Sequence, residues 1–251
     1  MTFPATPTAA AGTIIGAIQG NTNSPRVGPA LSGLTKSPGD GLIHLVWSYG
    51  CSLTNPFTST PSGWTQFCNL GSSGNMACGG YYKACDGTES AALSITQGGT
   101  VGGQSGSIDM ALPGMDTSVS PVVTAIVNGS TSIADPASLT PPWGNTADTT
   151  WISVVGNGET AAAALVTIAG PPPTNYGNQF TTGPTSGATT GEMDCGVAFR
   201  QLNAASEDVG PWSGIDVTSA RNAAFLIAIK GVTPPILLGR DRVPLIRASH
   251  F

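Results

Sequence analysis

Residues 74–83, Gly-Asn-Met-Ala-Cys-Gly-Gly-Tyr-Tyr-Lys, return at 191–200 as Gly-Glu-Met-Asp-Cys-Gly-Val-Ala-Phe-Arg. Glycine, methionine, cysteine, a second glycine, an aromatic residue and a cation recur at the same spacing. The segments around both copies also follow one order: an apolar strand, a proline or aromatic turn, a strand and then the Met-x-Cys strand. The repeat therefore predicts a chain built from two sequence-related halves.

The two halves could be arranged in either of two ways. Each could form one side of a single β-sandwich with a shared core, or each could fold as a small separate domain. About five strands per half would leave long unprotected edges in two separate domains. We therefore expect one sandwich, in which Cys78 and Cys195 occupy matching core positions and Lys83 and Arg200 mark matching strand ends.

Composition predicts an all-β fold. Charged residues make up 9% of the 251 residues, against roughly 25% in an average soluble protein. The 34 glycines and 20 prolines suit short strands joined by turns. A surface this poor in charge also favours burial against neighbouring subunits, so we expect a component of an assembly.

The hydrophobic pattern divides the chain into a sandwich domain over residues 12–231 between two arms, 1–11 and 232–251. Residues 98–106 read as a glycine-rich loop, and residues 161–166 as a strand. The other expected strands are 13–18, 42–49, 64–68, 76–84, 91–96, 118–127, 151–155, 191–200 and 222–230.

Charge and hydropathy exclude several partners. The net charge of −5 argues against nucleic acid, which needs a clustered basic face. No apolar run reaches the roughly 18 to 20 residues that span a bilayer, and the first residues lack the pattern of a secretory signal. Five cysteines, an odd number, read as reduced apolar residues. We expect synthesis in the cytoplasm.

Several short motifs resemble one protein family. They are Gly-Asp-Gly-Leu-Ile at 39–43, Pro-Ser-Gly-Trp-Thr at 61–65, Tyr-Tyr-Lys at 81–83 with Asp-Gly-Thr-Glu at 86–89, and Asp-Thr-Thr-Trp-Ile at 148–152 before a final apolar strand. In this order they resemble tailed-phage virion proteins of the jelly-roll β-sandwich type, which occur as capsid decorations and tail-associated proteins. The resemblance spans residues 39–231.

The resemblance implies a jelly-roll-like antiparallel sandwich that acts without catalysis. It implies a structural protein of the virion, made in the host bacterial cytoplasm, that binds capsid or tail subunits and copies of itself. The family offers no catalytic motif, no metal site and no cofactor to carry over. The stretch 232–251 departs from the family pattern as an additional tail.

Candidate catalytic residues are few. Of the two histidines, His44 lies in an apolar strand and His250 is the penultimate residue, so a triad or zinc site would depend on them. We expect His44 to be structural. The close carboxylate pairs are Asp86 with Glu89, expected in a turn, and Glu192 with Asp194, expected on a solvated strand face. Cys51 and Cys68 could form a disulfide only after release into an oxidising medium.

Two further groups of residues are candidates for binding a sugar or a neighbouring subunit. Trp64, Trp143, Tyr176 and Trp212 lie in or beside turns, where they could stack on a sugar. That interpretation gives an alternative function, a carbohydrate-binding host-adhesion module, although we expect these rings to close the ends of the core. A polysaccharide-degrading enzyme is a third, weaker reading. The C-terminal arm is expected to bind neighbouring subunits through Ile236, Leu237, Leu238, Arg240, Arg242, Leu245, Ile246 and Arg247.

Overall fold

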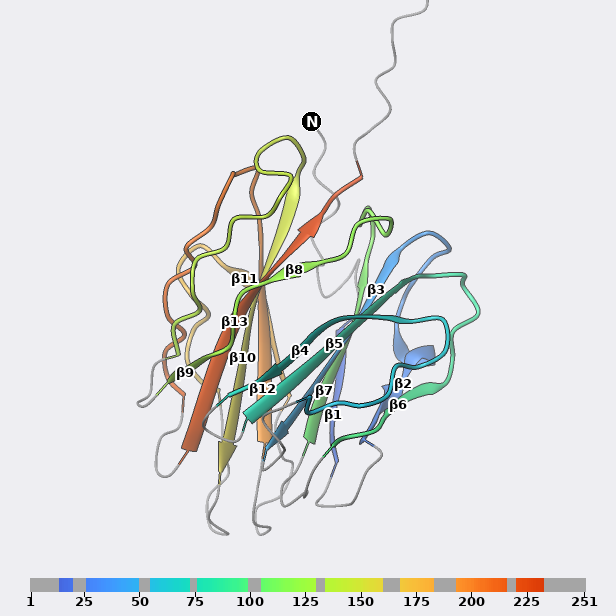
Figure 1. Cartoon of the computed structure of the whole chain (residues 1–251), viewed down its shortest axis with the longest axis horizontal. Coiled ribbons are helices and arrows are strands. Elements are labelled where there is room, and N and C mark those ends of the chain that lie inside the picture. Colours follow the sequence, from blue (N-terminus) through green and yellow to red (C-terminus); the bar gives the residue numbers. More distant parts are fainter. Residues whose placement is uncertain are drawn as a thin grey trace, which may run out of the picture.

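The computed structural model is an all-β protein with antiparallel strands (Figure 1). The structure describes residues 14–19, 26–49, 55–72, 76–98, 105–129, 134–159, 168–182, 193–215 and 220–232. Apart from a single turn of 3-10 helix, η1 (Leu31–Gly33), the regular elements in these ranges are strands. This confirms the fold class expected from composition.

The first large sheet takes its strands from the first half of the described chain. Its order is β1-β7-β3-β5-β4, and every neighbouring pair is antiparallel. The strands are β1 (Ile14–Gln19), β3 (Gly41–Tyr49), β4 (Thr65–Gly71), β5 (Met76–Ala84) and β7 (Ser105–Leu112).

The second large sheet takes its strands from the second half. Its order is β11-β12-β10-β13-β8, and β9 also pairs with β13. The strands are β8 (Val122–Val123), β9 (Val127–Gly129), β10 (Thr149–Glu159), β11 (Gly177–Thr182), β12 (Met193–Gln201) and β13 (Ala220–Lys230).

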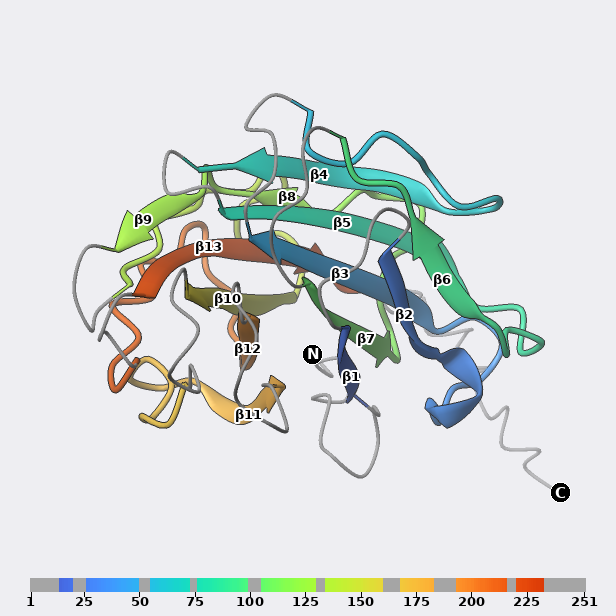
Figure 2. The same ribbon diagram turned by 90° about the horizontal axis from the view of Figure 1, so that it is seen from below.

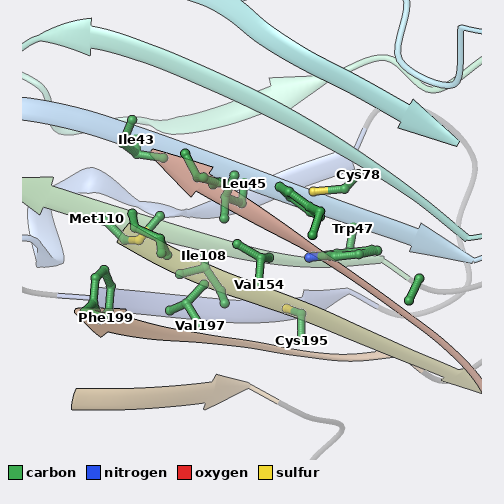
Figure 3. Packing of buried hydrophobic residues seen from close by; sticks show 14 of the residues in the cluster. Ile43, Leu45, Trp47, Cys78, Ile108, Met110, Val154, Cys195, Val197 and Phe199 are labelled. Atoms are coloured by element: carbon green, nitrogen blue, oxygen red, sulfur yellow. The ribbon is translucent and has the colours of Figure 1, made fainter. Parts of the chain in front are cut away.

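The two large sheets pack as a β-sandwich around one central core (Figure 3). Trp47 of β3 is fully buried and meets Phe225 of β13 across the interface, with ring centroids 5.7 Å apart. A Cβ added to Gly156 of β10 would lie 2.7 Å from Cε3 of Trp47, so the indole occupies the space above that glycine. Cys78 and Cys195 both lie in this core, as expected from the repeat.

Both large sheets are also covered on their outer faces. A small sheet of β2 (Arg26–Ala30) and β6 (Ala92–Ile95) lies against the first sheet (Figure 2). On the second sheet, Trp212 and Ile215 pack with Trp151 and Leu226 in a separate buried cluster. The central strands of each sheet are therefore buried on both faces, which explains why β3 and β7 are buried along their whole lengths.

The sequence identified most of these strands and missed two, β7 and β11. The structure places no strand over residues 118–121 and gives β8 and β9 as two short strands. β7 was missed because the glycine-rich run before it reads as a continuing loop. β11 was missed because its residues are largely polar. β2 lies in the stretch 20–40, where the sequence indicates a loop with room for one short strand. The arms at 1–11 and 233–251 and the expected strand at 161–166 lie outside the described residues.

Candidate functional site

His44 forms the most chemically suggestive contact of the first sheet. Its Nδ1 lies 2.8 Å from Oδ1 of Asp109, which occupies the directly opposite position on β7. Both side chains are buried, 1% and 0% exposed. Because a carboxylate accepts hydrogen bonds, the imidazole Nδ1 donates and the proton is fixed on that nitrogen. Sequence reasoning missed Asp109 together with its strand, although Ser105, Ser107 and Asp109 alternate with apolar residues as in a strand.

A second buried polar group lies beside this pair. Nε of Arg26 donates to Oε1 of Gln97 at 2.7 Å, and Oγ of Ser48 donates to the same oxygen at 2.7 Å. Arg26 is 2% exposed. These residues connect β2 and the segment after β6 to the outer face of β3, so they fasten the small sheet to the large one.

Asp194 is the outstanding titratable group of the second sheet. It is buried, and the backbone N–H of Ile168 donates to its Oδ2 at 2.8 Å. Burial raises the pKa of the carboxyl to about 7, against the opposing effect of backbone hydrogen bonds. On the neighbouring strands, Asn157 lies directly opposite Asp194, and Asn222 lies opposite Asn157. The three side chains form one buried polar row.

The burial of Asp194 corrects the expectation that its strand face is solvated. Residues around Ile168 and Ile215 cover the outer face of the second sheet, and the two form a bridge to each other. Strand alternation predicted correctly which face Asp194 occupies but could not predict the covering layer. Glu192, its expected partner, lies outside the described residues.

The turn after β5 holds an exposed ionic cluster. Nζ of Lys83 lies 2.7 Å from Glu89 and 3.4 Å from Asp86. Partial burial opposes ionisation of Glu89, but the bonds from Lys83, the Asp86 backbone and Cys85 lower its pKa to about 2. Asp86 accepts from the N–H of Thr88, as expected for a turn residue. This arrangement fixes a turn and forms no acid–base pair.

A similar ion pair follows β12. Nη1 of Arg200 donates to Oε1 of Glu207 at 2.6 Å, and the hydroxyl of Tyr176 donates to the same oxygen at 3.4 Å. Burial is the largest cause that raises the pKa of the Tyr176 phenol, and the negative charge of Glu207 raises it further. Lys83 and Arg200, which the repeat placed at matching strand ends, therefore both pair with a downstream glutamate.

The four aromatic candidates for sugar stacking are mainly core residues. Trp212 is fully buried, and its Nε1 donates to Oγ of Ser153 at 2.7 Å. Trp64 and Tyr176 are also buried. Trp143 is half-buried, and its Nε1 donates to Oγ1 of Thr149. The burial of three of the four agrees with the expectation that these rings belong to the core, and it disagrees with the alternative that they lie exposed for stacking on a sugar.

The described cysteines are free and buried. Burial raises the pKa of the Cys78 and Cys195 thiols well above the ordinary value, which keeps both protonated and unreactive. Within the described ranges, no three His, Cys, Asp or Glu side chains are placed to hold a metal ion. Nor does any helix in that part of the chain have the length and apolarity to cross a membrane.

Some predicted residues cannot be placed. Cys51, His250 and the arm residues Ile236, Leu237, Leu238, Arg240, Arg242, Leu245, Ile246 and Arg247 lie outside the described residues. Comparison with known proteins adds no relative: the chain matches no protein-family model, no curated protein and no solved structure.

Proposed function

We propose that this chain is a non-enzymatic structural component of a tailed-bacteriophage virion. In this role it lies on the particle surface, as a capsid decoration or a tail-associated protein, and binds neighbouring virion subunits and other copies of itself. The observation that carries the proposal is the order and spacing of the family motifs. In this chain Pro-Ser-Gly-Trp leads into β4, and Tyr-Tyr-Lys lies at the end of β5 before the Asp-Gly-Thr-Glu turn.

The buried polar chemistry is compatible with a structural role. His44 with Asp109, and Asp194 with its two asparagine neighbours, are sealed between layers of the fold, where a substrate has no access. The ionic clusters of Lys83 and Arg200 hold turns. These groups therefore stabilise the fold by linking neighbouring strands and turns.

The strand pairing supports jelly-roll-like halves. In the first half β1 pairs with β7, β2 with β6 and β3 with β5. In the second half β9 pairs with β13, Ala134 bridges Trp212, and β10 pairs with β12. Such nested pairing results when a long antiparallel hairpin folds over on itself, as in a jelly roll. We infer that the halves are two related units of this type.

In this role the strand edges and the two arms bind the neighbouring virion subunits. Val232 is the only exposed large hydrophobic residue among the described positions, so the described surface offers no broad apolar patch. Its N–H donates to the carbonyl of Gly114, and residue 233 follows from this exposed position. The arm beyond it carries three arginines, one aspartate and two apolar clusters, a composition suited to binding an acidic partner surface.

The arm can be tested in particle assembly. A chain lacking residues 233–251 is expected to fold normally, as judged by circular dichroism, but to be lost from particles purified from the source culture. A chain with the same 19 residues in shuffled order is the matched control for length and charge, and it should also fail. Normal incorporation of the truncated chain would refute the role of the arm, and absence of the full chain from particles would refute the virion proposal itself.

A further inference from the structure

Three buried side chains of the first large sheet lie close to Gly28 of β2. A Cβ added to Gly28 would lie 2.9 Å from Cε1 of His44, 3.3 Å from Oγ of Ser107 and 3.6 Å from Oδ2 of Asp109. The three residues are 1%, 4% and 0% exposed. The side chains of His44, Ser107 and Asp109 thus meet around one point between the small sheet and the first large sheet.

One hydrogen-bonding atom of each residue has no protein partner. They are Nε2 of His44, Oγ of Ser107 and Oδ2 of Asp109. A buried polar atom that makes no hydrogen bond costs about 1–3 kcal/mol, and native proteins satisfy nearly all such atoms with protein groups or ordered water. Three of them around one point need a common ligand.

We propose that this point is a binding site for a single internal water molecule. In the proposed site the His44 ring is neutral and donates from Nδ1 to Asp109, so its Nε2 is an acceptor. The water donates one hydrogen to this Nε2 and the other to Oδ2 of Asp109, and it accepts the hydroxyl hydrogen of Ser107. It makes three hydrogen bonds, the usual number for a buried water.

Two other ligands or roles fit the same residues less well. Serine, histidine and aspartate are the residue types of a nucleophilic triad, but a substrate cannot reach side chains that are 0–4% exposed. A metal ion would need further donors, and no cluster of three His, Cys, Asp or Glu side chains forms in the described chain. A water satisfies all three atoms without needing either.

Gly28 packs directly against the His44 ring. A methyl group on residue 28 would lie 2.9 Å from Cε1 of this ring, so alanine here would displace the ring and disturb the water site. The bound water then acts together with the Arg26–Gln97–Ser48 bonds to hold the small sheet against β3 and β7.

The site can be tested on the full chain in two ways. A high-resolution crystal structure should show an ordered water within hydrogen-bonding distance of His44 Nε2, Ser107 Oγ and Asp109 Oδ2. Nitrogen-15 NMR should show His44 protonated on Nδ1, with Nε2 resonating as an unprotonated acceptor. Gly28→Ala should lose the water and shift the His44 ring resonances. Gly177→Ala is the matched control, since a Cβ there meets no atom within 4 Å.

The crystal structure and the NMR measurement can both be made on the unmodified protein, so the proposal can be tested even if Gly28→Ala fails to fold. A direct hydrogen bond between any two of the atoms His44 Nε2, Ser107 Oγ and Asp109 Oδ2 would overturn the proposal. So would an ion in place of the water, or a proton on Nε2. Covalent labelling of Ser107 by a fluorophosphonate probe would also overturn it, since it would reveal an accessible nucleophile.

Discussion

Replacement of Asp194 by asparagine should change how the stability of the protein depends on pH. The carboxyl is buried, and its pKa is raised to about 7 in the folded protein, against 3.8 for an ordinary aspartate. Asparagine has nearly the same shape, carries no charge and can still accept the N–H of Ile168. Asp194→Asn therefore isolates the effect of ionisation from the effect of packing.

The sign of the effect follows from the direction of the shift. Between pH 4 and 7 the folded protein holds a proton on Asp194 that the unfolded chain has lost, so stability falls as pH rises through this range. One pKa unit corresponds to about 1.4 kcal/mol, which gives a total cost of about 4 kcal/mol at high pH. About 3 kcal/mol of this should appear between pH 5 and pH 9.

Urea unfolding at pH 5 and pH 9 measures this difference. The free energy of unfolding of Asp194→Asn, relative to the unmodified protein, should rise by about 3 kcal/mol between the two pH values. Asp208→Asn, which removes an exposed carboxylate, is the control for the loss of one negative charge. A stability difference that is the same at both pH values would refute a buried carboxyl that titrates near neutrality.

Two predictions test the core, and one tests the burial of tyrosines. Trp47→Ala should lower the free energy of unfolding by about 3–5 kcal/mol in urea titrations, and a loss below 1 kcal/mol would contradict its central position. Gly156→Val should also destabilise the protein, because its side chain would overlap the Trp47 indole. Burial raises the pKa of the Tyr81 and Tyr176 phenols. When either tyrosine is replaced by phenylalanine, the increase in phenolate absorbance of the folded protein up to about pH 11 should therefore equal that of the unmodified protein. A smaller increase in the variant would show that the replaced phenol ionises normally.

The sequence predicted the features that depend on local pattern. The Met-x-Cys repeat placed Cys78 and Cys195 in the core, alternation located β5, and continuous apolar runs located β3 and β13. These predictions succeeded because strand periodicity and apolar composition are local properties of the chain.

The features that the sequence could not predict depend on contacts between distant segments. Asp109 becomes the partner of His44 only when β7 pairs with β3, 65 residues away along the chain. Asp194 looked solvent-exposed because nothing in its own strand indicates the layer that covers it.

The most direct test of the proposed function is a cryo-electron microscopy density map of the particle from the source culture. The sandwich of residues 14–232 should fit an ordered density on the particle surface, with density continuing from Val232 onto a neighbouring subunit. Two results together would contradict a structural role in the virion. The map would account for all surface density without this fold, and mass spectrometry of the same particles would find no trace of the chain.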